Sequence, residues 1–268
     1  MEEVFFTCLC VALGLGSGFI GGLLGIGGGV VIVPALVLSY DFSGRFPPES
    51  SLVVAVATSL ACIVFTSASA AFAQYRAGKV RWDLFRKLVT FLLVGSFAAG
   101  FIAPALSPGV FRGFIGVFLA FVALVMLSNW QPHPHRQFPP TAGAAALGIT
   151  GGVAAGLAGI AGGNVIVPTL VYFNTPMHNA TATSSALGVP IALMGTIGYL
   201  VSATADDPLL PSYGYIDLYA FVPIVAGALI AAPLGVKLAH RFPAAILKRA
   251  FGTLLIFVSA RMLYSVFA

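Results

Sequence analysis

The stretch Gly18-Phe-Ile-Gly-Gly-Leu-Leu-Gly-Ile-Gly-Gly-Gly-Val-Val-Ile-Val-Pro34 places a cluster of glycines inside apolar sequence. The pattern returns 134 residues later as Gly152-Val-Ala-Ala-Gly-Leu-Ala-Gly-Ile-Ala-Gly-Gly-Asn-Val-Ile-Val-Pro168. Five glycines keep the same spacing in both copies, and both copies end in Val-Ile-Val-Pro. A repeat of this specificity indicates two related units in one chain, each beginning with a glycine break.

The composition indicates a membrane protein. Hydrophobic residues make up 59% of the chain and charged residues 8%, against about 25% charged residues in a soluble domain. Apolar runs of about 20 residues are long enough to cross a bilayer as helices. We therefore expect an all-α polytopic membrane protein surrounded by lipid. The net charge of +5 fits basic cytoplasmic loops, so no nucleic-acid partner is expected.

Polar punctuation divides the chain into two repeats, 1–128 and 141–268, joined by a linker at 129–140. Each repeat is expected to contain one long glycine-broken hairpin followed by three membrane helices. The expected hairpins and helices are 4–40, 51–74, 84–105 and 110–128, then 141–173, 179–203, 215–239 and 246–267.

The positions of lysine and arginine predict that the two repeats are inverted. If all eight segments crossed the membrane, seven basic residues would lie inside and six outside. If the first segment of each repeat enters and leaves on one side, ten of the thirteen basic residues lie inside. Cytoplasmic loops carry an excess of Lys and Arg, so we prefer the hairpin arrangement with both termini outside.

Inverted repeats that begin with a broken helix are typical of transporters. Adjacent glycines permit a sharp turn, and the helix that restarts after it directs unpaired amide groups toward a ligand. These groups suit an anion. The candidate binding residues at the two breaks are Gly27, Gly28, Gly29, Gly162, Gly163 and Asn164. The earlier glycines recur every four residues (Gly14, Gly18 and Gly22; Gly148, Gly152 and Gly156), which favours close helix packing instead.

Hydroxyl side chains recur in both repeats, and they complete the candidate site. Thr58 and Ser59 correspond to Thr183 and Ser184, and each could donate a hydrogen bond to an anion oxygen. The alternative is a bond back to the carbonyl of the preceding turn. No acidic residue is expected inside a span, so no buried carboxylate relay is predicted.

Enzyme and cofactor motifs are missing from the sequence. The histidines have no cysteines or carboxylates nearby, so no metal site is expected. Gly78-Lys79 lacks the remainder of a phosphate-binding loop, so ATP binding of that kind is not expected. We therefore predict a protein that is not an enzyme and that needs no cofactor.

The first motif, Gly18-x-x-Gly-Gly-x-x-Gly-Ile-Gly-Gly-Gly-x-x-x-Val-Pro34, is followed by Ala57-Thr58-Ser59 and Arg76-Ala-Gly-Lys-Val-Arg-Trp82. Together they resemble the sulfite exporter TauE/SafE family, also called the toluene-sulfonate uptake permease family. The resemblance implies a secondary carrier of sulfite or organosulfonates in the cell inner membrane, without a nucleotide-binding partner. Ala161 and Asn164 depart from the first copy of the motif, which predicts an asymmetric site.

The leading hypothesis is a secondary transporter that holds a small anion between the two glycine breaks. A passive anion channel is a second hypothesis. A membrane subunit that assists a sulfur-metabolism enzyme without transporting anything is a third. The sequence is compatible with a homo-oligomer.

Overall fold

The computed structural model describes residues 2–24, 28–76, 78–128, 138–203, 214–238 and 244–267, and within these ranges it contains ten α-helices. The first half forms α1 (Glu2–Leu24), α2 (Gly29–Ser43), α3 (Ser51–Arg76), α4 (Trp82–Ala105) and α5 (Pro108–Leu127). The second half forms α6 (Thr141–Ala158), α7 (Gly163–Tyr172), α8 (Met177–Ser202), α9 (Leu218–Leu238) and α10 (Ala244–Phe267). The all-helical class is confirmed, and each predicted helix is present with ends shifted by a few residues.

Both predicted breaks interrupt the helices where the glycines cluster. The cap residue before α2 is Gly28, with φ 76°, and the cap residue before α7 is Gly162, with φ 77°. Helix α6 ends at Gly159, which also has a left-handed backbone with φ 65°. Glycine adopts this conformation without the steric penalty that a Cβ atom imposes. Gly27 and linker residues 129–137 lie outside the described residues.

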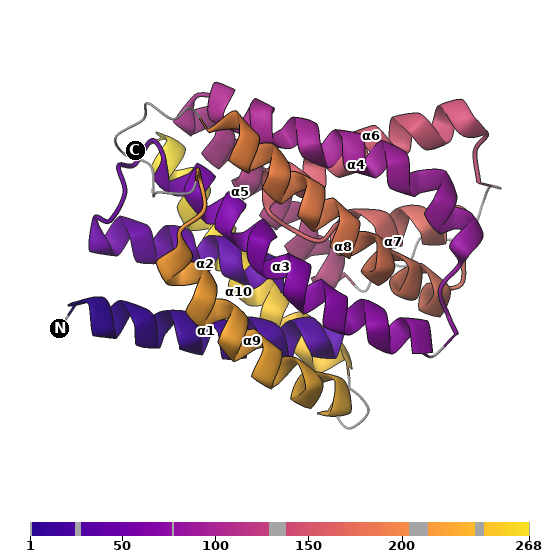
Figure 1. Cartoon of the computed structure of the whole chain (residues 1–268), viewed down its shortest axis with the longest axis horizontal. Coiled ribbons are helices and arrows are strands. Elements are labelled where there is room, and N and C mark those ends of the chain that lie inside the picture. The colour runs from indigo at the N-terminus through magenta and orange to yellow at the C-terminus, as the bar shows by residue number, and fades with distance from the viewer. Residues whose placement is uncertain are drawn as a thin grey trace.

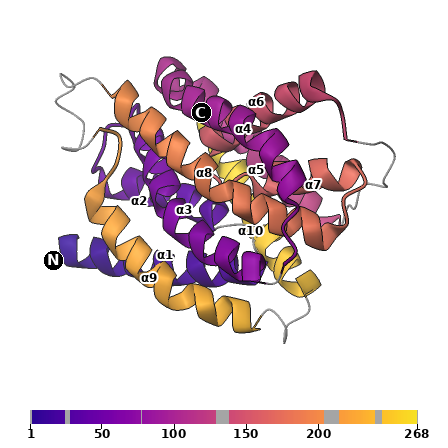
Figure 2. The same cartoon turned by 45° about the vertical axis from the view of Figure 1, so that its right-hand side comes forward.

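The two halves exchange helices. Helix α1 packs along α9 and α6 packs along α4, while α3 and α8 lie between these two pairs (Figures 1 and 2). A Cβ atom added to one of the glycines spaced by four would lie within 3 Å of the partner helix; these are Gly14, Gly18 and Gly22 of α1, and Gly148, Gly152 and Gly156 of α6. Close packing by these glycines, as predicted, is therefore confirmed.

Seven helices in the described part of the chain are long and apolar enough to cross a membrane: α1, α3, α4, α5, α6, α8 and α9. Helix α3 is the central one, because 83% of its apolar window is buried, against 33–56% in the other six. The first arms of the hairpins, α1 and α6, extend about 34 and 27 Å at 1.5 Å per residue. Each break therefore lies a long way along the bundle from the start of its hairpin.

Both chain ends lie on the left of Figure 1, where α1 begins and α10 ends, whereas α6 begins on the right. The two hairpins thus start from opposite ends of the bundle, as the predicted inversion requires. The division into two repeats and their inverted insertion in the membrane stay predictions.

Candidate functional site

The two glycine breaks lie against each other in the interior. A Cβ atom added to Gly29 would lie 2.7 Å from the carbonyl oxygen of Gly159 and 3.2 Å from the Cα atom of Ile160. The hydroxyl of Ser59, on α3, donates a hydrogen bond of 2.9 Å to the same Gly159 oxygen. A side chain of the first half therefore holds the broken helix of the second half in position.

Helices α2 and α7 begin at these breaks without a side-chain cap. The carbonyl oxygens of the cap residues Gly28 and Gly162 each accept hydrogen bonds of 2.7–3.4 Å from the backbone amides three and four residues further along the chain. Neither cap residue supplies a side-chain hydrogen bond to its helix, because glycine has no side chain. Helix geometry leaves the first amides, at 29–30 and 163–164, without an intrahelical acceptor. Both helix ends are buried, and their partial positive charge favours an anion.

Two of the predicted hydroxyls hydrogen-bond to the backbone at the starts of other helices. Thr58 accepts a 3.0 Å hydrogen bond from the amide of Asp217, which precedes α9. Thr183 accepts a 3.0 Å hydrogen bond from the amide of Arg81, which precedes α4. The two contacts occupy corresponding places in the repeat. They attach the exchanged helices to α3 and α8, and an anion contact of either threonine stays a prediction.

Ser184 and Asn164 remain as predicted binding residues of the second half. Ser184 is 1% exposed, and its hydroxyl has no hydrogen-bond partner among the described residues. Asn164 is half-buried at the first turn of α7. The structure therefore brings Gly29 and Ser59 to the second break, and it leaves the Ser184 hydroxyl buried and available.

Asp217 is a buried carboxylate that was not predicted from the sequence. It is 1% exposed, although it lies one residue before α9. Its carboxylate accepts hydrogen bonds from the Tyr40 hydroxyl at 3.1 Å and from the Tyr219 amide at 3.0 Å. The Arg45 Nε atom lies 3.6 Å from it.

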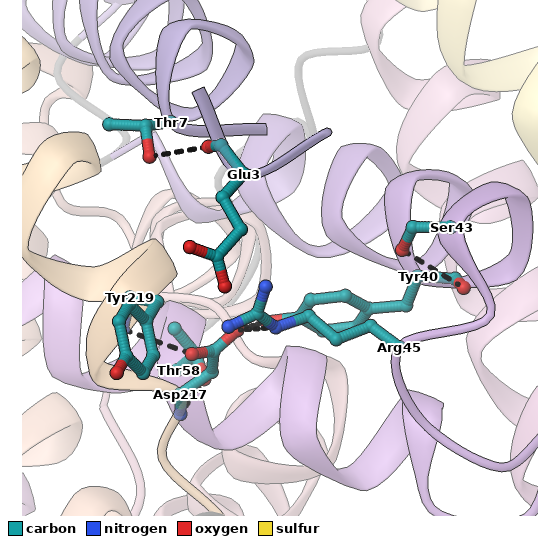
Figure 3. Close-up of polar contacts among 8 residues, drawn as sticks. All are labelled: Glu3, Thr7, Tyr40, Ser43, Arg45, Thr58, Asp217 and Tyr219. Carbon is teal, nitrogen blue, oxygen red and sulfur yellow. Dashed lines mark hydrogen bonds and ion pairs between the residues drawn. The ribbon is translucent and has the colours of Figure 1, made fainter. Parts of the chain in front are cut away.

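The Asp217 cluster connects four helices, and Figure 3 shows its members from three of them together with Arg45. Tyr40 belongs to α2, Thr58 to α3 and Tyr219 to α9. The Arg45 guanidinium also lies over the Phe6 ring of α1, 4.8 Å from its centroid. The cluster therefore links the first hairpin, formed by α1 and α2, to α9 of the second half.

The corresponding position before α4 has opposite charge and is open to solvent. Arg81 donates hydrogen bonds of 2.9 and 2.7 Å to Asp83, and both side chains are about half exposed. These hydrogen bonds raise the pKa of the Arg81 guanidinium above its usual value. The buried ionic cluster thus exists at only one of the two equivalent helix starts.

The whole chain can be compared with known proteins. The model of the family described as Sulfite exporter TauE/SafE matches residues 10–262. The chain belongs to the TauE/SafE family. A probable membrane transporter protein of Haemophilus influenzae is 31% identical, and the alignment covers 96% of this chain and 98% of that protein. A probable membrane transporter of Bacillus subtilis is 25% identical, covering 96% and 97%.

Membership of the TauE/SafE family and the seven apolar helices identify the chain as a multi-pass membrane transporter. In this TauE/SafE protein the repeated glycine clusters lie at both helix breaks. The described residues contain no group of three or more His, Cys, Asp and Glu side chains that could hold a metal ion.

Proposed function

We propose that the protein is a secondary transporter that moves a small sulfur-containing anion, sulfite or an organosulfonate, across the cell inner membrane. The observation that carries the proposal is the pair of uncapped helix N-termini, at Gly29 and Gly163, buried at adjacent breaks. Unpaired amides and helix dipoles attract anions. Irregular backbone inside a membrane is tolerated where protein buries it or where it lines a water-filled cavity.

The exchange of helices suggests how the site opens alternately to each side. Each hairpin packs on a helix of the other half, α1 on α9 and α6 on α4. A tilt of one hairpin together with the helix of the other half that packs on it would open a path to the breaks from one side. The same movement of the other pair would open a path from the opposite side. Such rocking of repeats around a fixed site is the usual mechanism of inverted-repeat carriers.

Flux measurements in proteoliposomes test the proposal. Sulfite, thiosulfate, sulfate and small sulfonates are supplied one at a time to vesicles that contain the purified chain. A triple variant with Ser59→Ala, Ser184→Ala and Gly28→Leu should lose most of the flux. A control chain with Gly16→Leu and Ser69→Ala carries the same kinds of change away from the breaks, since a Cβ at Gly16 meets nothing within 4 Å, and it should retain flux.

The kinetics separate carrier from channel. A carrier gives flux that saturates with anion concentration. Flux that rises without saturation indicates a passive channel. No flux of any tested anion by the purified chain rejects the proposal and favours a non-transporting role, and equal flux in the triple variant and the control rejects the site.

A further inference from the structure

Three side chains of α3 lie on one face, spaced by four residues, and all three approach the breaks. Ser59 donates its hydrogen bond to the Gly159 carbonyl. The Cδ1 atom of Ile63 occupies the space in which Gly29 would carry a Cβ atom. Ser67 continues this face, and its hydroxyl lies 3.3 Å from the Cβ position of Gly188 on α8.

The facing side of α8 is directed at the second break. A Cβ atom on Gly188 would lie 3.0 Å from the Cβ atom of Ala161 and 3.2 Å from its carbonyl oxygen. Ser184 lies one turn before Gly188 on the same face. Ile191 lies on that face as well, and its Cδ1 atom is 3.3 Å from the Cβ position of Gly162.

The two breaks have different neighbours although the repeats correspond. The repeat places Ile63 of α3 in correspondence with Gly188 of α8, and Ser67 in correspondence with Ala192. An isoleucine therefore packs against the first break. At the second break the corresponding position has no side chain, and the Ser67 hydroxyl lies beside it. The second break thus has a serine hydroxyl beside the position that Ile63 fills at the first, while Ile166 and Ile191 pack against Gly162.

Two buried hydroxyls, one on α3 and one on α8, lack hydrogen-bond partners among the described residues. Ser67 and Ser184 are each 1% exposed, and within the described ranges neither hydroxyl has a hydrogen-bond partner. Buried polar groups are nearly always paired in proteins, because an unpaired one loses its bonds to water. The unpaired Ser67 hydroxyl lies beside Gly188, which faces Ala161 at the second break, and this placement indicates that a ligand accepts its hydrogen bond.

We infer that the anion binds at the second break alone, held by the first amides of α7 and by the hydroxyls of Ser67 and Ser184, while Ile63 closes the first break. This inference rests on the proposed transport function. It adds Ser67 to the site and excludes a symmetric site shared by both helix ends.

The same geometry selects a singly charged anion. The side chains that approach the break glycines are uncharged, among them Ser59, Ile63, Ile166 and Ile191, and so is Ser67 beside Gly188. The amino end of α7 supplies the equivalent of about half a positive charge. Removing a dianion from water costs far more than removing a monoanion, and among the described residues no cationic side chain is found beside these glycines to offset that cost. The site therefore suits a sulfonate group, which carries one negative charge, better than sulfate.

Titration calorimetry of the purified chain with methanesulfonate and with sodium sulfate tests both statements. The wild-type chain should bind methanesulfonate at least tenfold more tightly than sulfate. Ser67→Ala should raise the methanesulfonate Kd about tenfold, a loss of about 1.4 kcal/mol. Ser69→Ala, a change on another face of the same helix, should leave it unaltered.

A double variant, Ser67→Ala with Ala192→Ser, moves the hydroxyl to the corresponding position of the other repeat. Affinity should not return, because Ile63 closes that side. Wild-type affinity in Ser67→Ala or recovery in the double variant overturns the second-break site, and equal affinity for sulfate overturns the charge selection. Binding of neither anion overturns this inference, and the proposed function also fails if liposome flux is missing.

Folding is checked separately by heating the ligand-free chains. The Ser67 hydroxyl has no hydrogen-bond partner in the described part of the chain, so Ser67→Ala should unfold at the wild-type temperature or higher. A marked fall in unfolding temperature would mean that the hydroxyl stabilises the fold, and it would overturn the role of Ser67 in binding.

Discussion

Replacing Asp217 by alanine should destabilise the protein far more than removing the acidic residue at the corresponding helix start, Asp83. Asp217 is buried and accepts hydrogen bonds from the Tyr219 amide and the Tyr40 hydroxyl. Asp83 is about half exposed and pairs only with Arg81 among the described side chains. The two changes remove the same chemical group from environments of opposite kind.

The expected loss follows from the contacts. Removing a helix-capping carboxylate costs about 1 kcal/mol. Leaving the buried Tyr40 hydroxyl without its acceptor costs about 1–3 kcal/mol. The Arg45 side chain is 26% exposed, so its lost ion pair adds at most about 1 kcal/mol. The sum is about 3 kcal/mol, whereas Asp83→Ala should cost at most about 1 kcal/mol, as exposed ion pairs do.

Thermal unfolding in detergent micelles, at one scan rate, measures the difference. At about 2–4 °C per kcal/mol for a chain of this size, Asp217→Ala should lower the apparent Tm by roughly 6–12 °C. Asp83→Ala should lower it by less than about 4 °C. Asp217→Asn keeps an oxygen that can cap α9 and should fall between the two. Equal Tm values for the two alanine variants would refute the assignment of Asp217 to a stabilising cluster.

Three further predictions concern the glycines and the topology. Gly18→Ala should destabilise the chain by about 1–3 kcal/mol through overpacking against α9, while Gly16→Ala, which meets open space, should be neutral or slightly stabilising in the same thermal assay. Gly162→Ala and Gly44→Ala both force an alanine into a left-handed backbone, at about 1–2 kcal/mol, but only Gly162→Ala should reduce anion flux in proteoliposomes. Alkaline phosphatase fused after α3 should be inactive and fused after α8 active; activity at both points would contradict the inverted repeats.

The helices and their breaks could be predicted from the sequence because membrane helices depend mainly on local composition. Runs of apolar residues and glycine clusters mark α1 and α2 without any knowledge of the remaining chain. The partners of these helices could not be predicted in the same way. The spacing of Gly14, Gly18 and Gly22 indicates close packing but does not specify that α9 is the neighbour.

The candidate site was predicted in part. The two glycine breaks lie against each other as expected, because they occupy equivalent positions in the two repeats. Ser59 contacts the second break. The structural contact of Thr58 was missed, although Asp217 follows the repeated Gly214 by three residues, as Arg81 follows Gly78. The burial of Asp217 was missed because its partner Tyr40 is 177 residues away. Ser67 was missed because its significance depends on the neighbouring α8.

The packing of helices from one half against helices of the other sets the order in which these contacts can form during synthesis. Helix α6 follows α4 after α5 alone, so their contact can form early as the chain leaves the ribosome. Gly14 of α1, by contrast, contacts Ile224 of α9, about 200 residues later. The glycine face of α1 therefore lacks α9 as its packing partner until nearly the whole chain has been inserted into the membrane. A chain that stops before α9 would leave that face without its partner, so the last part of the protein to be made completes the packing of the first.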